Sequence, residues 1–153
     1  MIFLDSDVFI IEMRYRRDPR SQMNRQVLDE LTRRQLPLAI TSHTLLEVIG
    51  VLSFNTTPAR LATLPVEIPL LFHLQVMPDP ANQPIYSGCA VADLVQRMGA
   101  KRGLGDAITV EQIHRLAPTA SLFLGWNAKH FIGKLTIPVM TPEEWWRQNQ
   151  PIP

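Results

Sequence analysis

The segment Ile2-Phe3-Leu4-Asp5-Ser6-Asp7-Val8-Phe9 is the most informative stretch of the chain, because an apolar run ends there in two carboxylates. A run without polar alternation is typical of a strand buried on both faces, as in the centre of a parallel sheet. Open α/β sheets bind their ligands at the carboxyl ends of the strands, where the strand order reverses. Asp5 is therefore our first candidate for a functional residue.

The composition indicates one globular domain. Of the 153 residues 46% are hydrophobic and 19% are charged, which favours a packed core over a disordered chain. The single cysteine, Cys89, cannot form an internal disulfide and fits a reducing compartment. No segment has the roughly 18 uncharged apolar residues of a membrane span, so we expect a cytoplasmic protein without membrane contact. We assign residues 1–146 to one domain and 147–153 to a short C-terminal tail.

The hydrophobic pattern predicts alternating strands and helices. After the first strand, we expect strands at 37–41, 72–77, 120–125 and 137–140, and helices at 8–15, 22–35, 43–54, 59–64, 85–99, 107–116 and from Pro142 onward. The proline-rich residues 55–84 are expected to be mostly irregular. The expected N-caps are Asp7 and Thr141, and Thr44 and Asp106 are candidate caps. This alternation favours an α/β fold with a mostly parallel sheet.

Acidic residues recur at the junctions between these elements: Asp5, Asp7, Glu47 and Asp106. Glu47 lies in an apolar helix, where a carboxylate is costly unless it is paired, protonated or bound to a cation. The alternative is a purely local role, Glu47 in a capping box with Thr44 and Asp106 as an N-cap. Because strand ends of a parallel sheet meet at one edge, the acids together suggest an acidic pocket.

An acidic pocket of this kind favours a hard divalent cation, since clustered carboxylates otherwise repel each other. Oxygen ligands suit Mg²⁺ or Mn²⁺, and no cysteine or histidine set indicates zinc. The chemistry favoured is phosphodiester hydrolysis. Asp5, Glu47 and Asp106 are the candidate metal ligands, Asn127 is a fourth candidate catalytic residue, and Asp7 and Ser6 are candidate supporting residues.

A basic segment, residues 14–20, surrounds Pro19 and includes an aromatic residue, Tyr15. Such a segment suits contact with a phosphate backbone, although a solvated loop is the simpler interpretation. The net charge of +1 does not by itself indicate a nucleic-acid-binding protein. The candidate RNA-binding residues are Arg14, Arg16, Arg17 and Lys129.

In four places, and in the same order, the sequence resembles the PIN-domain ribonucleases, most closely the VapC-like toxins of type II toxin–antitoxin pairs. The similar segments are Phe3-Leu4-Asp5-Ser6-Asp7-Val8, Thr41 to Val48 around Glu47, Gly105-Asp106-Ala107-Ile108 and Leu124 to Phe131 around Asn127. The resemblance implies a three-layer α/β fold, Mg²⁺ or Mn²⁺ at the acids, and RNA cleavage. For the toxin branch it also implies a homodimer and an antitoxin partner.

The sequence departs from this pattern at Asn127, where many members carry Asp, at Asp7, and in its proline-rich middle. Two alternatives therefore stay open. A PIN-like module without catalysis would bind RNA or a protein. A haloacid-dehalogenase-like phosphatase would use Asp5-Ser6-Asp7, although Phe9 and Val110 do not fit its motifs.

Overall fold

The computed structural model describes residues 1–79, 89–99, 103–117 and 119–150. Its elements in chain order are β1 (Ile2–Leu4), α1 (Ser6–Met13), α2 (Ser21–Arg33), β2 (Leu38–Thr41), α3 (Ser42–Ser53), α4 (Pro58–Leu71), β3 (Leu74–Met77), α5 (Val91–Gly99), α6 (Leu104–Leu116), β4 (Leu122–Leu124), the 3₁₀ helix η1 (Ala128–His130), β5 (Val139–Met140) and α7 (Pro142–Asn149). Within the described residues no helix combines the length and the apolar character needed to cross a membrane.

The five strands form one parallel sheet in the order β3-β2-β1-β4-β5. The chain builds outward from the central strand β1 to β3 and then returns to place β4 on the other side of β1. The strand order therefore reverses between β1 and β4, which is where ligands of open α/β sheets bind. The backbone N–H of Asp5 donates to the Leu124 carbonyl across this point (2.9 Å).

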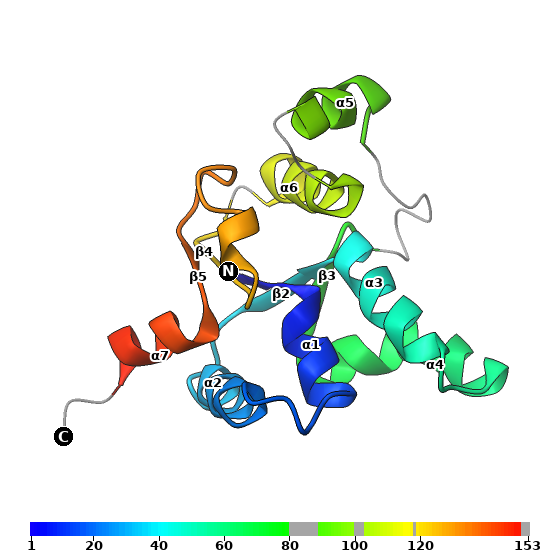
Figure 1. Cartoon of the computed structure of the whole chain (residues 1–153), viewed down its shortest axis with the longest axis vertical. Coiled ribbons are helices and arrows are strands. Elements are labelled where there is room, and N and C mark those ends of the chain that lie inside the picture. The colour runs from blue at the N-terminus through cyan, green and yellow to red at the C-terminus, as the bar shows by residue number, and fades with distance from the viewer. Residues whose placement is uncertain (80–88, 100–102, 118, 151–153) are drawn as a thin grey trace.

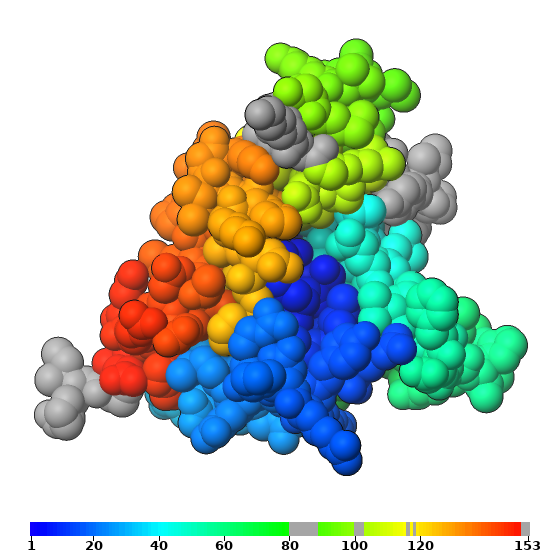
Figure 2. Space-filling model, viewed as in Figure 1, coloured from blue at the N-terminus to red at the C-terminus, as the bar shows by residue number. Residues whose placement is uncertain are grey.

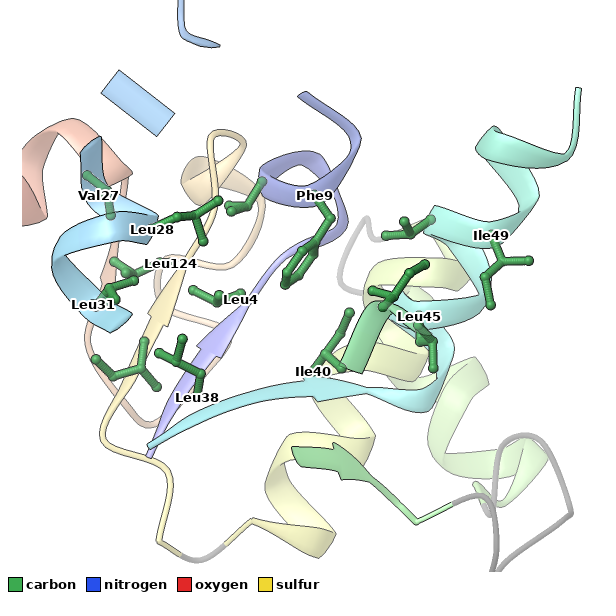
Figure 3. Close-up of a cluster of buried hydrophobic side chains, with 14 of the residues drawn as sticks. Leu4, Phe9, Val27, Leu28, Leu31, Leu38, Ile40, Leu45, Ile49 and Leu124 are labelled. Atoms are coloured by element: carbon green, nitrogen blue, oxygen red, sulfur yellow. The ribbon is translucent and has the colours of Figure 1, made fainter. Parts of the chain in front are cut away.

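The strand β1 is buried on both faces, as its uninterrupted apolar run predicts. On one face Leu4 packs with side chains of α1, α2 and α3, including Phe9, Leu31 and Leu45. Figure 3 shows these side chains filling the space between the sheet and the helices. On the other face Phe3 packs in a second cluster with residues of α6 and of the chain after η1. Figure 1 shows the helices on both sides of the sheet, which confirms the expected three-layer α/β architecture.

The last strand and helix form as their local sequence predicts. The strand β5 is an edge strand, as Pro138 indicates. Thr141 and Glu144 form a reciprocal capping box with Pro142 in the first turn. Trp145 is buried against the core. Because α7 continues to Asn149, the first residues of the expected tail, 147–149, are helical.

The expected cap Asp7 and the candidate caps Thr44 and Asp106 are wrong, each because the helix begins earlier. The cap of α1 is Asp5, whose carboxylate accepts from the Ser6 N–H, so β1 passes directly into the helix. The cap of α3 is Thr41, whose hydroxyl accepts from the Thr44 N–H. The cap of α6 is Gly103. Asp7 and Asp106 consequently lie in the first turns of their helices, and Glu47 takes no part in a capping box.

The proline-rich middle also differs from expectation. The expected short helix at 59–64 is the 14-residue helix α4, which contains Pro65 and Pro69. Two buried residues of α4, Leu64 and Ile68, anchor it on the core, so tertiary packing offsets the hydrogen bonds that the prolines lack. The helix expected at 85–99 is described from Val91 onward, and its expected start falls in residues 80–88, outside the described part of the chain.

Candidate active site

Asp5 occupies the point where the strand order reverses. It follows β1 directly and is only 7% exposed, and its carboxylate accepts from the Ser6 N–H at 2.9 Å. Burial raises the pKa of Asp5 well above the usual carboxyl value, and the nearby negative charge of Asp7 raises it further. The charges of Glu47 and Asp106 act in the same direction. Asp5 is therefore a buried carboxylate in an acidic environment.

Glu47 and Asp106 reach this environment from two other elements, α3 and the first turn of α6. The two helices approach closely where a Cβ added to Gly105 would lie 2.8 Å from Glu47 Oε1 and 3.0 Å from His43 Nε2. Each acid has a histidine neighbour: Glu47 Oε1 lies 3.3 Å from His43 Nε2, and Asp106 Oδ2 lies 3.6 Å from His130 Nδ1. The fold thus brings the three candidate metal ligands to one edge of the sheet.

The donor chemistry of these residues suits a hard divalent cation. Carboxylate oxygens are the preferred ligands of Mg²⁺ and Mn²⁺, and a bound cation would offset the mutual repulsion that raises the pKa of Asp5. The spacing is not that of a formed site, however. Among the described residues, no three Asp, Glu, His or Cys side chains are arranged so that they could hold a metal ion. The carboxylates therefore fit a hard divalent cation by their chemistry, and coordination would require the side chains to move closer together.

Asp7 is committed to the backbone of the turn that follows β4. Its Oδ1 accepts from the Trp126 N–H at 3.1 Å and its Oδ2 accepts from the Asn127 N–H at 2.9 Å. Burial raises the pKa of Asp7, and these two hydrogen bonds oppose that rise. A carboxylate that accepts two backbone N–H groups is poorly placed to act as a proton donor beside Asp5. This geometry disfavours the phosphatase alternative, in which Asp5 and Asp7 would act together.

The other candidate catalytic and supporting residues, Asn127 and Ser6, lie at the same edge. Asn127 precedes η1, is exposed, and its side chain does not cap that helix. Its amide is therefore available to a ligand, while its backbone N–H is held by Asp7. Ser6 begins α1 and contributes its backbone N–H to Asp5.

The candidate RNA-binding arginines lie elsewhere or are engaged. Arg14 donates to the Val51 carbonyl of α3, and its Cζ lies 5.5 Å from the centroid of the Tyr15 ring. Arg16 lines a groove of 590 Å³ between α1, α2 and the end of α4, and none of the four acids lines that groove. Arg17 and Lys129 are exposed. Of these four residues, Lys129 in η1 is nearest in sequence to a site residue.

The sequence interpretation missed several residues that the fold brings to the site. Arg20 lies over the Trp126 ring, with 5.7 Å from Cζ to the ring centroid. His43 and His130 stand beside Glu47 and Asp106. The spacing of His43 and Glu47, four residues apart on one helix face, was a detectable signal. No sequence signal could have revealed the contact between Arg20 and Trp126, since 106 positions separate the two residues.

A buried polar bridge joins α3 to α6 and so fixes the spacing of Glu47 and Asp106. The Gln112 amide donates to Ser42 Oγ at 3.0 Å and accepts from the His43 N–H at 3.3 Å. The Thr44 and Thr109 hydroxyls lie 3.4 Å apart between the same helices. Buried polar groups that are paired in this way favour one helix register over others.

The fold is PIN-like, with a five-stranded parallel sheet flanked by helices. The chain is similar to a solved chain in the structure of FitAB bound to an IR36 DNA fragment, with a TM-score of 0.59 and 14% sequence identity. The similarity covers 93% of this chain and 95% of that one. No protein-family model and no curated protein matches the sequence. At 14% identity the similarity establishes the fold alone.

Proposed function

We propose that this protein is a metal-dependent endoribonuclease that hydrolyses RNA phosphodiester bonds. The observation that carries the proposal is the environment of Asp5, which is buried at the strand-order reversal among carboxylates from α1, α3 and α6. Burying several carboxylates near one another is costly unless a cation compensates them. A stable fold that keeps this arrangement is best explained by a bound divalent ion.

In this proposal Asp5, Glu47 and Asp106 hold Mg²⁺ or Mn²⁺. These residues would place an ion that, when bound, would lower the pKa of a water molecule and offset charge on the phosphodiester. Asp7 keeps the turn at Trp126 and Asn127 in place through its two backbone hydrogen bonds. The exposed Asn127 amide is then positioned to orient water or a phosphate oxygen.

We further propose that the protein is a toxin of a toxin–antitoxin pair that acts in the cytoplasm as a homodimer and is held inactive by its antitoxin. The motif resemblance to VapC-like toxins supports this finer assignment. The PIN-like fold, shared over nearly the whole chain with a FitAB structure, is consistent with it.

A catalytically inactive RNA- or protein-binding module is the second candidate. Two observations favour it: position 127 is Asn, and the described side chains do not form a ready-made metal site. Under this alternative the acids would be a structural remnant, and added metal would neither stabilise the protein nor support cleavage.

Cleavage of a mixed RNA pool by the purified chain, in Mg²⁺ or Mn²⁺ and in EDTA, tests the proposal. Asp5→Asn and Asp106→Asn should abolish metal-dependent cleavage, whereas Asp29→Asn, an exposed carboxylate on α2, should leave it unchanged. Mn²⁺ should also raise the melting temperature of the wild type by mass action. Cleavage that persists in both site variants would refute the assignment of the acids as its site, and no cleavage with no stabilisation by Mn²⁺ would refute the ribonuclease assignment.

A further inference from the structure

Arg20 brings a positive charge to the edge of the sheet where the four candidate carboxylates lie. It precedes α2, and its guanidinium lies over the Trp126 ring, directly after β4. It is close enough to Asp7 for the two charges to interact. Figure 2 shows the blue N-terminal helices against the amber segment that follows β4.

The position of Arg20 is fixed by its neighbours. Asp18 accepts from Arg20 Nε at 2.9 Å and from Nη2 at 2.7 Å, and the hydrogen bonds with Arg20 lower the pKa of Asp18 to about 2. The ring beneath the guanidinium is also held, because the Trp126 indole N–H donates to Asn24 Oδ1 at 2.9 Å. Asn24 is fully buried and donates in turn to the Val8 carbonyl of α1. The arrangement is preorganised by residues of α1, α2 and the turn after β4.

This arrangement leaves part of the guanidinium open to a ligand. The two bonds to Asp18 use Nε and Nη2, and the Arg20 side chain is 45% exposed. Arginine has five N–H donors, so the Nη1 group and one hydrogen of Nη2 are not used by Asp18. A planar guanidinium with free N–H groups on an aromatic ring suits a phosphate oxygen.

We propose that Arg20 binds a phosphate of the RNA strand beside the acid site, an inference that rests on the proposed ribonuclease function. An RNA strand that enters an edge lined by four carboxylates needs a cation to hold its backbone there. Arg14 is engaged with α3, and Arg16 faces a groove lined by none of these acids. Arg20 is thus a substrate-binding residue, and it takes the role that the sequence assigned to Arg14 and Arg16.

Steady-state cleavage of one short single-stranded RNA in Mn²⁺, at several KCl concentrations, tests this role. The matched control is Arg33→Gln, because Arg33 is the last residue of α2, the helix that Arg20 precedes, and is likewise paired bidentately with a carboxylate, that of Glu30. Arg20→Gln should raise KM about tenfold with kcat within about twofold, and should reduce the slope of log KM against log salt by roughly 0.7. Arg20→Lys should restore part of the loss, since it keeps the charge without the planar fork.

Equal KM values and salt slopes for Arg20→Gln and Arg33→Gln, with an active wild type, would overturn the inference and leave the ribonuclease assignment intact. A fall in kcat and melting temperature with unchanged KM would also overturn it, because that pattern marks a purely structural role. If the wild type cleaves no RNA, the proposed function fails, and fluorescence anisotropy of labelled RNA in EDTA decides on Arg20. Equal RNA affinity of wild type and Arg20→Gln would then refute the phosphate-binding role of Arg20. A several-fold weaker RNA affinity of Arg20→Gln would support that role.

Discussion

Gly125 packs so closely against Asp5 that a Cβ at position 125 would lie 2.7 Å from Asp5 Cβ and 2.9 Å from Asp5 Oδ2. Glycine at the end of β4 is therefore what allows β1 and β4 to pair while the Asp5 carboxylate lies between them. This contact ties the conformation of the strand end to the position of the candidate metal ligand.

Gly125→Ala should displace Asp5 or the end of β4, because Asp5 Cβ is fixed to the backbone and cannot rotate away. We expect a loss of stability of about 1–3 kcal/mol and loss of most RNA cleavage. Chemical denaturation and cleavage assays measure the two effects. Gly105→Ala is the control for stability alone, since an added Cβ there meets the flexible end of the Glu47 side chain and the edge of His43. Equal stability of the two variants would contradict the role assigned to Gly125.

Asp7→Asn should destabilise the protein by about 1–3 kcal/mol. An Asn side chain offers only one oxygen, so its NH₂ group would face one of the two backbone N–H groups that Asp7 now accepts from, those of Trp126 and Asn127. Asn127→Ala should leave the melting temperature nearly unchanged, because the Asn127 side chain makes no capping hydrogen bond, yet should reduce cleavage. An unaffected melting temperature in Asp7→Asn would show that these hydrogen bonds contribute little.

The stability of the metal-free protein should decrease as the pH rises through the elevated pKa of Asp5. Because the folded-state pKa lies above the unfolded value, the stability contributed by protonated Asp5 is fully present below the unfolded pKa and lost above the folded one. Asp5→Asn should therefore raise the melting temperature in EDTA near pH 7, and this gain should vanish below about pH 4. A pH-independent gain would exclude the titration of Asp5 as its cause.

Glu30 provides a comparison of opposite sign. Hydrogen bonds from Arg33 and Arg34 lower the pKa of Glu30 to about 2. The stability that ionised Glu30 contributes to the folded state is fully present above the unfolded pKa and is lost as the pH falls through about 2. Glu30→Gln should therefore lower the melting temperature slightly near pH 7, with no gain at any pH.

Gln112→Leu should impair cleavage because it removes the amide bridge between α3 and α6. It deletes the hydrogen bonds with Ser42 and the His43 N–H, at an expected cost of about 1–3 kcal/mol. Cleavage should fall further than the folded fraction, since Glu47 and Asp106 lose their fixed spacing. Gln26→Leu, at an exposed position of α2, is the control for the same substitution. If cleavage falls only in proportion to the folded fraction, Gln112 contributes to stability and does not position the acids.

Features that depend on neighbouring residues could be predicted from the sequence. The apolar run before Asp5 predicts a doubly buried strand, and Thr141, Pro142 and Glu144 predict the start of α7. The start of α3 was misassigned because Thr41 and Thr44 are both good caps, and only the extended backbone of Thr41 distinguishes them. The length of α4 was missed because Leu64 and Ile68 stabilise it through contacts with the distant core.

The sequence by itself determined the chemical types at the site, carboxylates that follow or flank predicted strands and helices, and with them a preference for a hard cation. Tertiary structure alone decided how these residues are used. The Asp7 carboxylate accepts from backbone N–H groups that are 119 and 120 positions away in the sequence. The Asn24 side chain accepts from the Trp126 indole N–H, which is 102 positions away. Local periodicity carries no information about such contacts, because they exist only after the parallel sheet has brought the ends of β1 and β4 together.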